Sequence, residues 1–101
     1  MDIENLLSEK QFSPDQPVKK DLWESANFTV ALICLKAGLQ IPPHPEPLSA
    51  FFTVLEGRGV FTSGSESVEL GPGGAISISS NDLRGIKSLE DLVVLGVHDP
   101  H

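Results

Sequence analysis

Short apolar runs separated by glycine- and proline-rich turns form the pattern of this chain. The clearest run covers residues 50–56, where Ala50, Phe52 and Val54 fall on one face of an extended segment. Runs of this length, bounded by turn residues, are typical of β-strands. Further runs of the same kind lie at residues 18–24, 28–36, 60–63, 67–70, 75–79, 83–88 and 91–98. The pattern therefore predicts seven or eight short strands and an antiparallel sandwich or barrel.

The start of the chain has a different pattern. Three apolar side chains among its first twelve residues have helical spacing, which predicts a short N-terminal helix. So short a helix is marginal alone and needs a partner surface. Residues 13–17 hold two prolines and are typical of a break. We therefore expect one domain over residues 1–101, in which a lead-in at 1–17 precedes a barrel at 18–98.

The composition indicates which classes of partner and which cellular compartment to expect. Seven basic against 14 acidic residues give a net charge of −7, which argues against nucleic acid or an anionic membrane as partner. No apolar run approaches the roughly 20 residues that a membrane helix needs, and the acidic N-terminus lacks the pattern of a signal peptide. The single cysteine, Cys34, lies in an apolar run and is expected to be a small buried hydrophobe. These features together predict a cytoplasmic protein.

A proline-rich loop carries the candidate chemistry. Residues 42–47 hold four of the eight prolines, together with His44 and Glu46. Proline fixes φ and disfavours helix, so the loop is expected to be stiff and extended. Residues i and i+2 of an extended segment point the same way. We therefore expect His44 and Glu46 to face one side together and to form part of a site.

Residues 38–57 resemble the first conserved motif of the cupin family, G-x5-H-x-H-x3,4-E-x6-G. Gly38 and His44 occupy matching positions. Glu46 falls where the second His of the motif belongs, and Ala50 falls where its Glu belongs. The spacing of the motif is kept, but most of its chemical residues are replaced.

Residues 73–88 resemble the second cupin motif, G-x5-P-x-G-x2-H-x3-N. Gly73 matches, and Arg84 stands where the His belongs. The resemblance covers about residues 28–98. It implies an all-β fold, a double-stranded β-helix (jelly-roll) barrel, and it places Phe52 among the residues that line the interior.

The resemblance also bears on cofactors. In cupins with the complete pattern, three His and one Glu hold a divalent metal inside the barrel. Here His44 is kept and Glu46 is able to coordinate, but Ala50 has no donor atom, and the permanent positive charge of Arg84 would repel a metal. We therefore expect no tightly held cofactor. The alternative is Mn, Fe, Ni or Zn at His44 and Glu46.

Two orientations of Arg84 are open. If it points inward, it pairs with Glu46 and anchors a carboxylate or phosphate ligand. If it points outward, it extends into solvent at the barrel mouth and pairs with Asp82. The inward orientation predicts a ligand pocket formed by His44, Glu46, Ala50, Phe52 and Arg84.

Three functions follow from these alternatives. The first is a cupin-fold protein that binds a small anionic molecule without a tightly held metal, with enzymatic activity left open and no catalytic residue identified. The second is a metal-dependent enzyme of isomerase or dioxygenase type, which uses His44, Glu46 and a further ligand such as His98. The third is a sensor or interaction module whose barrel is filled by side chains.

The remaining large residues bear on assembly. Phe51 and Leu55 lie opposite in parity to the interior positions, so they should face outward, where the N-terminal segment or a second subunit would cover them. Small cupins commonly form homodimers through such β surfaces, and the resemblance implies one here. Trp23 is expected in the core or at an interface. His98 is expected to be a surface or packing residue, and His101 a tail.

Overall fold

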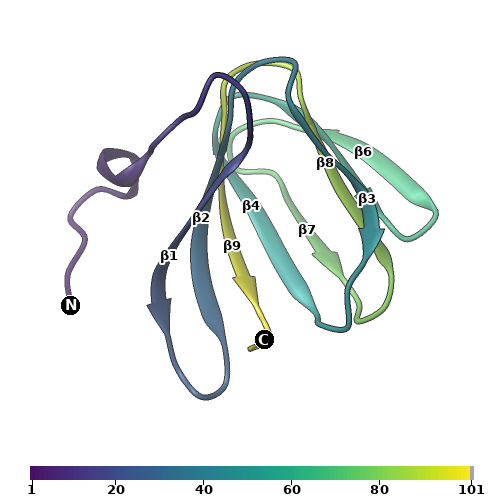
Figure 1. Cartoon of the computed structure of the whole chain (residues 1–101), viewed down its shortest axis with the longest axis horizontal. Helices are drawn as coiled ribbons and strands as arrows, with labels where there is room; N and C mark the ends of the chain where they lie inside the picture. Colours follow the sequence, from purple (N-terminus) through teal and green to yellow (C-terminus); the bar gives the residue numbers. More distant parts are fainter. Residues whose placement is uncertain (101) are drawn as a thin grey trace.

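The computed structural model describes residues 1–100 as two facing antiparallel sheets (Figure 1). The C-terminal His101 lies outside the described residues. The elements in chain order are η1 (Leu6–Glu9), β1 (Val18–Glu24), β2 (Thr29–Leu35), β3 (Gln40–Pro45), β4 (Ala50–Glu56), β5 (Gly59–Ser63), β6 (Glu66–Leu70), β7 (Ala75–Ile78), β8 (Leu83–Ser88) and β9 (Leu92–His98). One sheet has the strand order β1-β2-β9-β4-β7 and the other β3-β8-β5-β6. The predicted all-β jelly roll is confirmed.

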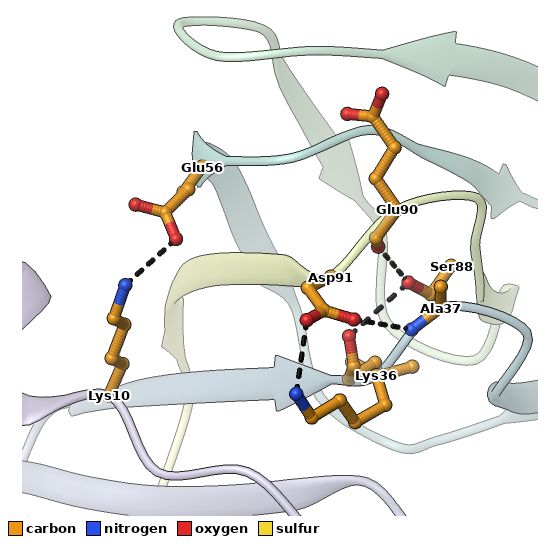
Figure 2. Close-up of polar contacts among 8 residues, drawn as sticks. Lys10, Lys36, Ala37, Glu56, Ser88, Glu90 and Asp91 are labelled. Atoms are coloured by element: carbon orange, nitrogen blue, oxygen red, sulfur yellow. Dashed lines mark hydrogen bonds and ion pairs between the residues drawn. The ribbon is translucent and has the colours of Figure 1, made fainter.

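The predicted N-terminal helix is present as a single 3-10 turn, η1. Leu7 and Phe12 pack on the outer face of the larger sheet, over a buried cluster from β2 and β9 that includes Cys34. Lys10 Nζ lies 3.0 Å from Glu56 Oε1 and ties this segment to the end of β4 (Figure 2). Burial raises the pKa of the Cys34 thiol, and its predicted role as a small buried hydrophobe is confirmed. Within residues 1–100, no helix is long and apolar enough to cross a membrane.

The proline segment is extended, as predicted, but it forms a strand rather than a loop. Within the described residues, β3 lies at the edge of its sheet and pairs with β8 alone. Proline lacks an N–H donor, so a strand that contains it is tolerated at an edge, where one side of the backbone needs no partner. The sheet thus accommodates Pro42, Pro43 and Pro45.

Apolar side chains from both sheets meet in one core between them. Its buried members are Ile33, Leu35, Ala50, Phe52, Val54, Phe61, Ile78, Ile86, Leu92 and Val94. Three successive inward positions of β4 are among them, as the alternation along that strand predicts. The ring of Phe52 lies against Gly96 of β9, where an added Cβ would be 2.9 Å from a ring carbon. A larger residue at Gly96 would displace this ring.

Polar contacts close one end of the barrel (Figure 2). The Asp91 carboxylate accepts hydrogen bonds from the Ala37 backbone N at 2.9 Å and from Lys36 Nζ at 3.1 Å. The bond from Ala37 is the main reason why the pKa of Asp91 lies below its ordinary value of 3.8. The buried Ser88 hydroxyl contacts carbonyl oxygens from two neighbouring segments. The exposed Asp91 carboxylate and the buried Ser88 hydroxyl thus both find partners within the chain itself.

Gly57 and Gly38 form a matched pair for testing how tightly this end is packed. Both have positive φ, +83° and +88°. A Cβ at Gly57 would lie 2.0 Å from the Asp91 carbonyl oxygen, whereas one at Gly38 would meet no atom of residues 1–100 within 4 Å. We expect Gly38→Ala to lower the free energy of unfolding by about 1–2 kcal/mol through backbone strain alone. Gly57→Ala should lose at least about 2 kcal/mol more, because the β4–β5 turn must move away from β9. Urea denaturation measures both losses, and equal values would contradict the prediction.

Candidate functional site

The candidate site lies at the opposite end of the barrel, beside the start of β8. His44 is paired with Arg84 across β3 and β8, after an irregularity in the ladder between Ile41 and His44. Gly85 permits this irregularity, because a Cβ there would lie 2.9 Å from Pro43 N and 3.0 Å from the Ile41 carbonyl oxygen. Local backbone geometry thus brings His44 and Arg84 to the same end of the barrel.

Arg84 points inward and is 8% exposed. Its Nη2 donates hydrogen bonds to the carbonyl oxygens of Leu48 at 2.5 Å, Glu46 at 3.3 Å and Ser79 at 3.3 Å. The backbone N of Asn81 also donates to the Glu46 carbonyl, at 2.7 Å, from a left-handed conformation that Asn tolerates. Arg84 therefore fastens the β3–β4 loop to the β7–β8 loop.

The other two guanidinium nitrogens of Arg84, Nε and Nη1, are buried and have no hydrogen-bond partner within residues 1–100. A buried charge that lacks partners is costly, so such groups call for a compensating anion or hydrogen-bond acceptor. The predicted outward orientation with Asp82 is wrong, since Arg84 is buried. The expected ion pair with Glu46 is also wrong in its detail, because Arg84 contacts the Glu46 carbonyl oxygen and forms no ion pair with its carboxylate.

His44 and Glu46 face the same side, as predicted. His44 Nδ1 lies 3.3 Å from Glu46 Oε1, and the two side chains are 71% and 44% exposed. Both are therefore accessible to solvent, in contrast to the buried Arg84. This pair sits at the mouth of the site and Arg84 lies deeper.

These three residues line one pocket of about 140 Å³. Its complete lining is Ile33, Ile41, His44, Glu46, Phe52, Arg84, Gly85 and Ile86. Four of the five predicted pocket residues are thus brought together. The third function considered, a sensor or interaction module, stays a prediction.

Ala50, the fifth predicted residue, lies elsewhere. It belongs to the core and lines a separate hollow together with His98. His98 is buried, as expected of a packing residue: its Nε2 lies 3.0 Å from Lys19 Nζ and its Nδ1 lies 2.6 Å from the Asp99 carbonyl oxygen. A carbonyl only accepts, so Nδ1 carries the proton and Nε2 accepts from the Lys19 ammonium. Both ring nitrogens of His98 are therefore engaged away from the pocket.

The residues present do not fit the metal site of a complete cupin motif. Within residues 1–100, no group of three or more His, Cys, Asp or Glu side chains is placed to hold a metal ion. His44 and Glu46 supply two donors, and the nearby Arg84 is a permanent cation. His98, named as a further ligand for the enzyme alternative, does not share their pocket.

Sequence reasoning missed the apolar wall of the pocket, formed by Ile33, Ile41 and Ile86. One signal was available: Ile86 is two residues after Arg84 in a strand, so both side chains must face the same side. For Ile33 and Ile41 no local signal exists, because their strands belong to different sheets and meet only in the folded barrel.

Comparison with known proteins identifies the family of this fold. Residues 31–97 match the family described as the cupin domain. The chain belongs to the cupin family. The predicted resemblance is therefore confirmed, and this small cupin keeps the barrel while departing from the family's metal-binding motif.

Solved structures share this fold. An RmlC-like cupin from Desulfovibrio desulfuricans is 27% identical to this cupin, with a TM-score of 0.87 and coverage of 99% of this chain and 97% of that chain. TT1209 from Thermus thermophilus is 24% identical, with a TM-score of 0.90 and coverage of 99% and 98%. SPY1581 of Streptococcus pyogenes, a conserved protein of unknown function, is 22% identical, with a TM-score of 0.85 and coverage of 99% and 89%. No curated protein matches the chain.

Proposed function

We propose that this cupin binds a small anionic molecule in the pocket at Arg84, without a tightly held metal. The observation that supports this most directly is the buried guanidinium, of which Nε and Nη1 have no hydrogen-bond partner in the described part of the chain. An anion that reaches them would supply the missing charge and acceptors, and hydrogen bonds between charged groups are the strong ones.

Pocket size and net charge support a small ligand. A volume of about 140 Å³ is close to the roughly 150 Å³ of an engineered cavity that holds benzene. The net charge of −7 gives no long-range attraction for anions, so recognition rests on the local charge of Arg84. The cytoplasmic setting predicted from the sequence is compatible with such a ligand and remains a prediction.

A binding experiment tests the anion. In ¹⁵N-labelled protein titrated with isovalerate or inorganic phosphate, we expect amide shift changes centred on the pocket residues Ile41, Gly85 and Ile86. Arg84→Met should abolish them, because the ligand charge then has no partner. Arg58→Met is the matched control, since Arg58 is exposed and pairs with Glu69 on the surface of β6; its shifts should equal those of the wild type.

Arg84→Met also removes the hydrogen bonds that join the β3–β4 and β7–β8 loops. Because the loss of these bonds could itself disturb the pocket, a second variant is needed. Ile41→Phe fills the pocket and leaves the Arg84 contacts to carbonyl oxygens in place. It should block binding as well. Shift changes that persist in both variants, or their absence from the wild type with every anion, would overturn the proposal.

The second candidate, a metal-dependent enzyme, rests on the 3.3 Å contact between His44 and Glu46. Two protein donors beside a guanidinium make a weak site for Mn, Ni or Zn. We expect protein incubated with each metal and then desalted to retain well below one metal ion per chain, measured by elemental analysis. Stoichiometric retention that is lost in His44→Ala would favour the enzyme instead.

We also propose that the partner of the outer sheet face is a second copy of this chain. Trp23, Val30, Val97 and Phe51 form one uncharged row across β1, β2, β9 and β4, since each is paired with the next in the ladder. Trp23 and Phe51, at the two ends of this row, are 51% and 49% exposed. The prediction that Trp23 lies in the core is therefore wrong, and its interface alternative stays a prediction.

The geometry of this outer row favours a symmetric partner. A two-fold axis through its middle sets the Trp23 end of one copy against the Phe51 end of the other, which is a self-complementary contact. Beside the row lies an apolar groove of about 420 Å³ between η1 and β1, which extends the surface. Leu55 is partly buried and packs on the same outer cluster as Leu7 and Phe12 of the N-terminal segment.

Sedimentation velocity tests this assembly. We expect a dimer for the wild type and a monomer for Phe51→Lys, because two buried ammonium groups would be desolvated without partners. Val68→Lys is the matched control: Val68 is 42% exposed but lies on β6 of the other sheet, so the variant should remain dimeric. A monomeric wild type, or a dimeric Phe51→Lys, would contradict the proposal.

A further inference from the structure

The pocket holds two opposite charges that do not neutralise each other. Arg84 lies deep and Glu46 lies at the mouth, both in the lining of the same hollow. Their one direct hydrogen bond joins Arg84 Nη2 to the Glu46 carbonyl oxygen. Within residues 1–100, the Arg84 guanidinium forms no ion pair with the Glu46 carboxylate. A ligand that satisfies both would need an acceptor for Arg84 and a donor for Glu46.

The Glu46 carboxylate is partly free for such a donor. Its Oε1 faces His44 Nδ1 at 3.3 Å, whereas no contact within the described part of the chain involves Oε2. An ionised carboxylate accepts hydrogen bonds and donates none. The group that meets Glu46 is therefore an amine or a hydroxyl and not a second anion, which the like charge of Glu46 would repel.

The remaining lining residues determine which hydrocarbon part of a ligand fits the pocket. Ile33, Ile41, Phe52 and Ile86 supply the apolar part of the lining, in the same pocket as the two charged side chains. About 140 Å³ accommodates roughly the size of a six-carbon molecule. A short branched hydrocarbon body suits this apolar lining.

We infer that the ligand is a small amino acid or hydroxy acid, with its carboxylate at Arg84, its amine or hydroxyl at Glu46 and a short apolar body against the isoleucine wall. The inference rests on the proposed anion site and narrows it to a carboxylate that carries its own donor. It distinguishes this class from phosphate and from simple carboxylates, which satisfy Arg84 alone.

The same ¹⁵N titration tests the inference with four molecules that share a branched hydrocarbon body, and with phosphate as a further anion. Valine and 2-hydroxyisovalerate carry both groups, isovalerate carries the carboxylate alone and isobutylamine carries the amine alone. We expect valine or 2-hydroxyisovalerate to bind about ten-fold more tightly than isovalerate, as one hydrogen bond to a charged group predicts. Isobutylamine should give no saturable shifts.

A variant at the pocket mouth isolates the donor contact. Glu46→Gln should remove most of the preference for valine over isovalerate while isovalerate still binds, because Arg84 is unchanged. Glu69→Gln is the matched control, since Glu69 is an exposed carboxylate that pairs with Arg58 outside the pocket. The Glu69→Gln variant should prefer valine over isovalerate by the same factor as the wild type.

The outcomes separate this inference from the proposed function. Equal affinity for valine, 2-hydroxyisovalerate and isovalerate, or binding of phosphate alone, overturns the inference and keeps the anion site. A preference for valine that persists in Glu46→Gln also overturns it. If none of the anions shifts the pocket amides, both the inference and the anion site fail.

Discussion

The open end of this barrel depends on the burial of one guanidinium. Nη2 of Arg84 holds together the β3–β4 and β7–β8 loops through carbonyl oxygens. Among the residues that the structure describes, Nε and Nη1 of the same buried group have no partner. A group that serves only to fasten loops would not require two further desolvated nitrogens. The structural role of Arg84 and its proposed ligand-binding role are therefore compatible, since they would use different atoms of one side chain.

The two ends of the barrel differ in how their polar groups are satisfied. At the closed end, Asp91 and Ser88 find hydrogen-bond partners within the chain, and Gly57 allows the turn to pack against the Asp91 carbonyl oxygen. At the other end, the cupin metal ligands are replaced by an alanine that joins the core, a carboxylate at the mouth and a buried cation. This cupin has the barrel and core of its family, whereas the side chains at its open end differ from the family's metal-binding motif.

Several features were predictable from local pattern. Alternation along residues 50–56 correctly placed Phe52 inside and Phe51 outside, and the proline spacing correctly placed His44 and Glu46 on one side. Other features were not. The proline segment became a strand because an edge of the smaller sheet was available, and Trp23 proved exposed because β1 is itself an edge strand whose outer face is left uncovered. Edge positions are decided by strand order, which local pattern does not contain.

The sequence by itself determined the all-β class, the jelly-roll resemblance and the substitutions at the metal-ligand positions, because strand periodicity, turn residues and motif spacing are local. Only the tertiary structure decided that Arg84 turns inward, that Ala50 joins the core and that His98 lies in a separate hollow. These outcomes depend on which strands of the two sheets meet across the barrel. That arrangement is set by the packing of side chains far apart in the chain, and no short stretch of residues encodes it.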